Sequence, residues 1–339
     1  MSPAHRSPGW IFPAMATSSA GSPMWKGSRA LSPCPIRHKA MDDISNHMTE
    51  LSPFHKGEQR LQDRAGRREL AENIGRKFIR PYLTEEQQDF FRYLQYLFLS
   101  ARDRDGWPRP LFLQDDLPLI TVPDDQHLIL HGPSGDLRDG QQLGVLGLDL
   151  STRRRNRVNG RVIAREDGFT ILRVDQAFGN CPQYIDLETV NDIPASGPEA
   201  PLPHLTSELQ MIIRSSRRFF IASGYDAHLN DAFSGMDISH RGGAPGFVQL
   251  PAPDRLLFPD YAGNNFFNTL GNILMDGRAG LMFVDFRTGT QLRLLGKARV
   301  IFENFDKSGW IAQPDAPEAK RLVELKVEKI LFAPGKIPS

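Results

Sequence analysis

The feature of this sequence that most constrains its fold is an internal repeat. Residues 144–162, GVLGLDLSTRRRNRVNGRV, align without a gap with residues 280–298, GLMFVDFRTGTQLRLLGKA. Two glycines of each stretch recur, and so do three polar residues between them. The identical pairs are Gly144/Gly280, Asp149/Asp285, Thr152/Thr288, Arg157/Arg293 and Gly160/Gly296. Such self-similarity predicts two copies of one structural unit. Because neither copy alone is large, we expect the two to pair and bury a shared face.

The pattern around the repeat predicts β structure. From Phe98 onward, short apolar segments are separated by turn residues such as Asp105-Gly106 and Asp139-Gly140, and this spacing fits a barrel or sandwich. Helices are expected only before the first copy and near the repeat's borders. One of them should open at the capping box Thr84-Glu85-Glu86-Gln87. We therefore predict a mainly β protein with flanking helices, built from two tandem barrel domains.

Composition divides the chain into four parts. Residues 1–50 are rich in Ser, Pro, Gly and Ala and contain no acidic residue before Asp42, so they cannot bury enough surface to fold. This basic tail is either a targeting peptide or an extension upstream of a start at Met41 or Met48, and we favour the extension. Residues 51–190 should hold a helical lead and the first copy, 191–204 a Pro-rich linker, and 205–339 the second copy.

Charge and cysteine content exclude several classes of protein. Lys+Arg 41 against Asp+Glu 40 gives a net charge of +1, which argues against nucleic acid as a partner. The arginine run at 153–157 is either a solvated turn or a segment that holds a nucleic acid or a nucleotide tail. Two cysteines make a disulfide framework and a cysteine-based metal site improbable, and no apolar run approaches the roughly 20 residues that span a bilayer. We expect a cytoplasmic protein with no membrane and no metal, and no hydrolase or NTPase motif is present.

The second copy contains a candidate anion site. After the apolar run Leu256-Leu257-Phe258 and a turn ending at Gly263, a helix should begin near Asn264-Asn265 and end at Gly277. Its apolar residues recur at three- and four-residue spacing, at Phe266, Phe267, Leu270, Ile273 and Leu274. The start of such a helix offers unpaired N–H groups and a positive dipole end, which suit a phosphate.

The two copies differ in a complementary way. Where the second copy has YAGNNFFNTLGNILMDGR, the first has only HGPSGDLRDGQQ. Conversely, the first copy carries RRRNRVNG and QAFGNCPQYI, and the second has TQLRLLG and EKILFAPGKI at those places. A composite site between the halves would produce this pattern.

These residues resemble the motifs of a known family. PDYAGNNFFNTLGNI and GLMFVDF in the second copy, with RNRVNGRV and DQAFGNCPQYI in the first, resemble the flavin-nucleotide-binding, pyridoxamine 5′-phosphate oxidase-like proteins. The similarity spans roughly Phe54 to Phe332 and includes FHKGEQ at 54–59, which resembles tandem members. It implies split β-barrels that pair, with FMN in the cleft between them. Where the classical oxidases place a Lys after the turn, this chain has Asn.

The resemblance also implies which residues hold the cofactor. The turn and helix of the second copy would lie near the FMN phosphate or ribityl chain, and Arg241 would be a charge partner of the phosphate. The residues of this turn and helix are Gly263, Asn264, Asn265, Thr269 and Asn272. Groups of the first copy would lie across the cleft, namely Arg157, Asn159 and the turn Asn180-Cys181-Pro182. From its own sequence setting, Cys181 is expected to be an inert thiol.

The expected function is that of an FMN-binding flavoprotein, an oxidoreductase that uses a small-molecule substrate or an electron donor such as NADH or NADPH. The alternative is a non-catalytic module that binds or stores flavin or haem; for haem, His204, His228 and His240 are the available ligands. His240 could instead donate a proton beside the flavin or serve a structural role. No catalytic residue is assigned, and pairing of two chains as a homodimer stays open.

Overall fold

The computed structural model describes residues 52–114, 118–132, 137–166, 168–179, 183–190, 192–226 and 235–336. The tail predicted at 1–50 lies outside these residues. The described chain begins with the helices α2 (Lys56–Arg64), α3 (Arg68–Phe78) and α4 (Glu85–Arg92). The predicted capping box is confirmed at α4, where the Thr84 side chain accepts a hydrogen bond from the Gln87 N–H and the Gln87 side chain accepts one from the Thr84 N–H. Three further helices follow later: α5 (Ser207–Ser215), α6 (Asn268–Asp276) and α7 (Phe305–Ser308).

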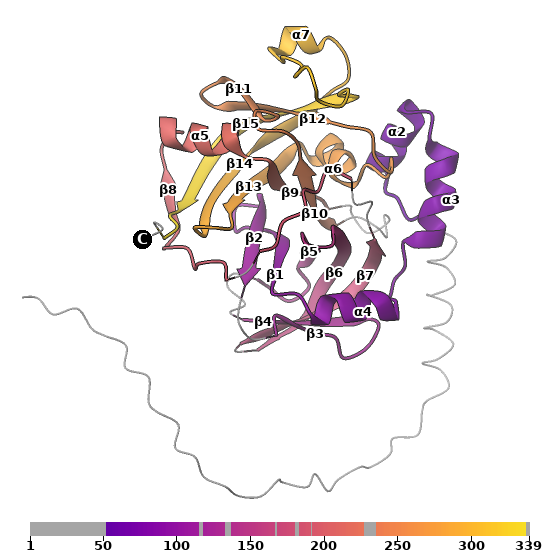
Figure 1. Cartoon of the computed structure of the whole chain (residues 1–339). Helices are drawn as coiled ribbons and strands as arrows, with labels where there is room; N and C mark the ends of the chain where they lie inside the picture. The colour runs from indigo at the N-terminus through magenta and orange to yellow at the C-terminus, as the bar shows by residue number, and fades with distance from the viewer. Residues whose placement is uncertain are drawn as a thin grey trace, which may run out of the picture. The chain divides into compact units, whose positions relative to one another are not determined.

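The first sheet is antiparallel and has the strand order β2-β1-β5-β6-β7-β4-β3 (Figure 1). Its strands are β1 (Tyr96–Arg102), β2 (Pro108–Gln114), β3 (Ile120–Thr121), β4 (His127–His131), β5 (Gln142–Asp149), β6 (Arg154–Glu166) and β7 (Phe169–Gly179). Helix α4 covers this sheet, because Phe90 and Phe91 belong to the same buried cluster as Leu97, Leu143 and Val158.

The second sheet repeats the first strand for strand, in the order β10-β9-β13-β14-β15-β12-β11. Its strands are β9 (Arg218–Tyr225), β10 (Gly235–Gly242), β11 (Gln249–Ala252), β12 (Arg255–Asp260), β13 (Arg278–Asp285), β14 (Thr290–Ile301) and β15 (Arg321–Ala333). A short strand within the predicted linker, β8 (Ala200–Leu202), pairs with β15. The prediction of two tandem split-barrel-like domains is confirmed.

The glycines of the repeat have a structural cause. A register shift between β6 and β7 falls at Asn159/Gly160, and the corresponding shift between β14 and β15 falls at Leu295/Gly296. A Cβ atom on Gly160 would lie 2.1 Å from the Arg173 carbonyl oxygen, and one on Gly296 would lie 2.1 Å from that of Lys326. Each bulge brings two backbones too close for any side chain, so both copies retain glycine.

The two sheets pack against each other with reciprocal contacts. Phe98 of β1 pairs with Leu146, and its counterpart Phe220 of β9 pairs with Met282; the two phenyl rings stack with centroids 3.5 Å apart. A Cβ on Gly144 of β5 would meet the β10 backbone at 3.0 Å, and one on Gly280 of β13 would meet the Pro108 carbonyl oxygen of β2 at 2.2 Å. These matched contacts relate the halves by a pseudo-two-fold axis, as expected for copies that bury a shared face.

The leading helix α2 packs on the second barrel, although it precedes the first in sequence. Leu61 of α2 lies in one buried cluster with Leu270 and Ile273 of α6. In Figure 1, α2 and α6 lie side by side. No helix among the described residues is long and apolar enough to cross a membrane.

Candidate functional site

A cleft lies where the start of α6 meets strand β6 of the other half. We call it the α6 cleft. It is lined by Arg155 and Arg157 of β6, by Tyr184, by Arg241 of β10, and by the turn and helix start from Asp260 to Leu270. Both barrel copies therefore contribute to one cleft, as their complementary differences predict. The Tyr184 hydroxyl, which donates to the Ala262 carbonyl oxygen at 3.0 Å, joins the halves across its mouth.

The turn that leads into α6 is held by one buried carboxylate. Asp260, at the end of β12, accepts from Arg241 at 2.9 Å with one oxygen and from Arg321 at 2.9 Å with the other. Two arginines from different strands, β10 and β15, are thereby fixed at the edge of the cleft, and charge-assisted bonds of this kind are strong and directional.

The helix begins later than the sequence predicted. Asn264 and Asn265 were expected as the N-cap, but α6 starts at Asn268 with Phe267 as its N-cap residue. Asn264 instead accepts from the Phe266 N–H at 3.2 Å, and Asn265 and Phe267 adopt left-handed backbone angles, φ 59° and 63°. Asn therefore caps a tight turn here, and the turn delays the helix. The C-cap at Gly277 is confirmed, whereas Leu274, predicted to be buried, is 42% exposed.

The start of α6 has donors that its own helix does not use. Phe267 provides no side-chain cap, and the N–H of Gly271 makes a 2.6 Å bond to the Phe267 carbonyl oxygen. Asn268, Thr269 and Leu270 come before Gly271, so their N–H groups have no acceptor within the helix, and these residues line the cleft. An uncapped helix start of this kind attracts an anion through its N–H groups and its dipole.

Arg157 is the buried arginine of the cleft. Its guanidinium forms an ion pair with Asp237 of β10 at 2.8 Å and donates to the Ser239 hydroxyl at 2.7 Å. It also donates to the Asn268 side-chain oxygen at 3.2 Å. The first copy's repeat arginine thus binds both β10 and α6 of the second copy, and it joins the two halves under the cleft.

His240 differs from the other cleft residues because it is buried without a hydrogen-bond partner. The side chain is 5% exposed, and neither ring nitrogen has a partner among the described residues. Burial lowers the pKa of His240 well below its ordinary value, and the nearby Arg155, Arg218 and Arg241 lower it further. The imidazole is therefore neutral, with one donor and one acceptor nitrogen available to a ligand.

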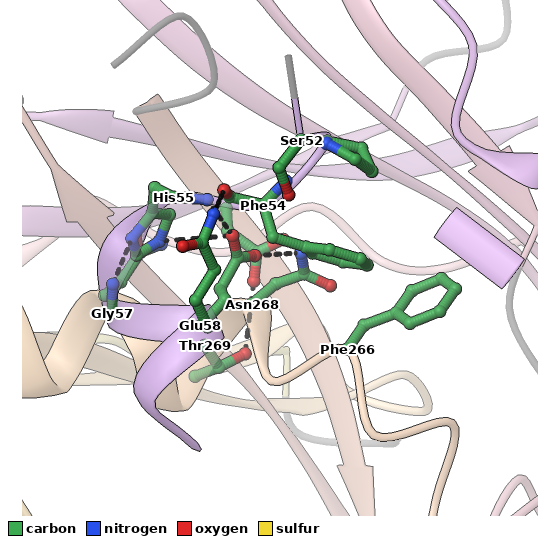
Figure 2. A network of polar contacts seen from close by, with 12 residues as sticks. Ser52, Phe54, His55, Gly57, Glu58, Phe266, Asn268 and Thr269 are labelled. Atoms are coloured by element: carbon green, nitrogen blue, oxygen red, sulfur yellow. Dashed lines mark hydrogen bonds and ion pairs between the residues drawn. The ribbon is translucent and has the colours of Figure 1, made fainter. Parts of the chain in front are cut away.

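A second polar network lies behind the cleft and is shown in Figure 2. The buried Glu58 of α2 accepts from the His55 N–H at 2.8 Å and from the Asn268 side-chain amide. Burial raises the pKa of Glu58 well above its ordinary value, while the hydrogen bonds from His55 and Asn268 oppose that rise. Glu58 thus reaches the same Asn268 whose oxygen binds Arg157.

The residues predicted to hold a cofactor divide into three groups. The α6 cleft brings together Arg157, Arg241, Gly263, Asn264, Asn265 and Thr269. Asn159 and Asn272 lie instead in a smaller polar pocket on the other side of Asn268, and the Asn272 amide donates to Ser223 at 3.2 Å. Asn180 and Cys181 lie outside the described residues.

Sequence reasoning missed three residues of the site. Arg321 was not singled out in the sequence, and Asn268 lay only within a predicted helix. Glu58 belongs to the FHKGEQ stretch, which was noticed but given no role. The signal that could have found Glu58 is the position of this stretch in the sequence. It lies before both copies and has no counterpart in the second, so it can contribute a residue that the repeat does not supply.

The pseudo-symmetric counterpart of the cleft is filled by the chain itself. Arg293 takes the place of Arg157, but strand pairing puts Arg109 where Asp237 would be. Glu199 of the linker forms ion pairs with both arginines, and Arg293 also donates to the Pro110 carbonyl oxygen at 2.9 Å. The described residues of the connection between β4 and β5 form no helix corresponding to α6. Among the described residues, the α6 cleft is open to a ligand and its counterpart is occupied by Glu199.

Comparison with known proteins identifies the fold family. Residues 205–333, the second barrel, match the family described as pyridoxamine 5′-phosphate oxidase. The second barrel therefore belongs to the pyridoxamine 5′-phosphate oxidase-like family. The resemblance inferred from the motifs is therefore confirmed. No curated protein matches this sequence.

Three solved structures illustrate the similarity of this chain to known proteins. HupZ of Group A Streptococcus is 17% identical, with a TM-score of 0.28, over 39% of this chain and 98% of that one. A putative pyridoxamine 5′-phosphate oxidase from Lactobacillus delbrueckii is 19% identical, with a TM-score of 0.28, over 38% and 97%. An FAD-binding protein from Mycobacterium smegmatis is 14% identical, with a TM-score of 0.26, over 40% and 99%.

Proposed function

We propose that this protein binds FMN in the α6 cleft and uses it as an oxidoreductase. The observation that carries the proposal is the convergence of an uncapped helix start with arginines from both barrel copies. Four arginines and one aspartate are the charged residues among the described lining of the cleft. A phosphate dianion needs such a set of N–H and guanidinium donors.

The described residues also fit the rest of a flavin nucleotide. His240 is buried in the same cleft with two unpaired ring nitrogens, which a ligand with donors and acceptors would satisfy. The N–H groups of α6 and the guanidinium of Arg241 would hold the phosphate, and Arg157 would fix the first barrel against it.

The chemistry itself belongs to the cofactor: FMN, when bound, supplies a two-electron redox centre. The protein positions it. Asp260 keeps Arg241 and Arg321 at the cleft edge, and the neutral His240 can donate or accept one hydrogen bond without adding charge. The proposed electron source is NADH, NADPH or a reduced small-molecule substrate.

The test is binding of two ligands, FMN and riboflavin, to the purified full chain, followed by fluorescence and the visible spectrum. We expect FMN to bind at least about tenfold more tightly than riboflavin, because only FMN offers a phosphate to charge-assisted donors. Arg241→Gln should weaken FMN by about ten- to hundredfold and leave riboflavin unchanged. Arg287→Gln, on an exposed turn, is the matched control. A chain that binds neither flavin would overturn the proposal.

A non-catalytic storage module is the second candidate, and His240 is the observation that favours it. A neutral, buried imidazole with no partner is also a suitable axial ligand for haem. His204 is exposed and His228 lies outside the described residues. Haem uptake with a Soret band that His240→Ala abolishes would support haem storage. Anaerobic bleaching of bound FMN by NADH or NADPH, with multiple turnovers in air, would support the oxidoreductase.

A further inference from the structure

The FHKGE stretch at 54–58 builds a rigid entry to α2. The His55 Nδ1 accepts from the Gly57 N–H at 3.0 Å, and the Glu58 side chain accepts from the His55 N–H. This capping box leaves the second oxygen of Glu58 free to reach out of the helix. Phe54 fastens the same stretch to the turn before α6, because its ring lies 5.2 Å from that of Phe266.

Two glycines let α2 and α6 approach to backbone distance. A Cβ on Gly57 would lie 2.4 Å from the Gly271 carbonyl oxygen, and a Cβ on Gly271 would lie 2.7 Å from the Glu58 nitrogen. Only hydrogen fits at either place. The side chain of Glu58 therefore contacts Asn268, the first residue of α6, as Figure 2 shows.

The two ends of the Asn268 amide bind different partners. Its nitrogen donates to Glu58, and its oxygen accepts from Arg157 at 3.2 Å. Each Glu58 oxygen accepts from a donor, one from the His55 N–H and one from the Asn268 amide, and a guanidinium can only donate, so Glu58 dictates which end of Asn268 faces Arg157. If the amide turned over, its nitrogen would face the guanidinium and two donors would oppose each other.

We propose that Glu58, from the helix that precedes both barrels, is a positioning residue for the flavin site: it orients Asn268 and thereby fixes Arg157 and the start of α6. The role rests on the proposed flavin binding, and it makes the N-terminal helix a third component of a site that two barrels line. Glu58 acts through Asn268 rather than by touching the cofactor.

The test is a swap of the hydrogen-bonding pair. Glu58→Gln keeps the shape but offers one acceptor where two donors, the His55 N–H and the Asn268 amide, need one each. Adding Asn268→Asp restores the set, since the new carboxylate can accept from both the introduced amide and Arg157. Glu69→Gln on the exposed face of α3 is the matched control.

We expect Glu58→Gln to weaken FMN binding about tenfold, the loss of one well-placed buried hydrogen bond. The double variant should recover to within about threefold of the unaltered chain, and the control should not change. A second readout needs no ligand: amide hydrogen exchange across residues 266–276 should be about tenfold faster in Glu58→Gln and return in the double variant.

The outcomes separate the two proposals. If the unaltered chain binds FMN and Glu58→Gln binds it equally well, with unchanged exchange in α6, the positioning role is overturned and flavin binding stands. If Glu58→Gln weakens binding but the double variant does not recover, Glu58 acts through general stability, and the role is again overturned. If the unaltered chain binds no flavin, the proposed function fails first and the role fails with it.

Discussion

Replacing Gly57 by Ala tests whether α2 holds α6 in place. Two effects oppose each other. Ala is intrinsically favoured over Gly inside a helix by about 1 kcal/mol. Against this, the new Cβ would lie 2.4 Å from the Gly271 carbonyl oxygen and 2.6 Å from the Met275 side-chain Cγ, and the Gly271 backbone cannot yield without moving α6.

The steric overlap should outweigh the gain in helix propensity. Normal contact needs about 1 Å more separation, and overpacking a well-packed site costs about 1–3 kcal/mol. A shift of that size also separates Glu58 from Asn268, which adds about 1 kcal/mol. After the helix gain is subtracted, we expect Gly57→Ala to lower the free energy of unfolding by about 1–3 kcal/mol and to weaken FMN binding in parallel.

The assay is urea unfolding followed by fluorescence, with FMN titration of the folded protein. Gly263→Ala serves as the control for stability, because a Cβ there would meet nothing within 4 Å and its backbone is not left-handed. Its unfolding free energy should change by less than about 0.5 kcal/mol. If Gly57→Ala proves as stable as the unaltered chain and binds FMN equally, the close approach of α2 and α6 does not exist in solution.

Three further predictions concern other parts of the molecule. Phe98→Ala should destabilise the chain by about 3–5 kcal/mol, measured by urea unfolding, since it removes half of the ring stack with Phe220. The pKa of His240 is lowered in the folded chain, so its contribution to stability is full above its ordinary pKa of 6.5 and is lost as pH falls toward the lowered value. In His240→Gln this loss of unfolding free energy should be smaller, by up to about 1.4 kcal/mol per pH unit. Unfolding measured at pH 7.5 and at pH 5.5 checks this. Equilibrium dialysis should find one FMN per chain, because Glu199 occupies the counterpart position; two per chain would refute this reasoning.

The features that sequence could predict are those that repeat. The recurring glycines, strand periodicity and a capping box follow from local sterics and hydrogen bonding, so the order of strands in one copy predicts the other. The complementary losses between the copies also pointed to a shared cleft, and Arg157 lies in it. These features need no knowledge of how distant segments meet.

What sequence could not predict depends on long-range contacts. Nothing local tells that Asn264 caps a turn instead of a helix, because both uses satisfy the same amide oxygen. Glu58 looks like a capping-box residue and nothing more; its second partner, Asn268, lies 210 positions away. The linker composition likewise predicts an unstructured connection, although the half-buried Glu199 makes two ion pairs.

The asymmetry between the copies follows from joining them in one chain. In a symmetric pair, each half would have to supply both an α6-like helix and an arginine facing the partner. Once the halves are covalently linked, one complete site needs only one such helix and one such arginine, although the second half also keeps its arginine, Arg293. Here the first half retains Arg157 and the second retains α6. The vacated counterpart then holds Arg109 and Arg293 as like charges, which would repel each other unless an anion lay between them. Glu199 is that anion, supplied by the linker that joins the halves. The connection between the copies therefore also stabilises the position that no longer needs a ligand.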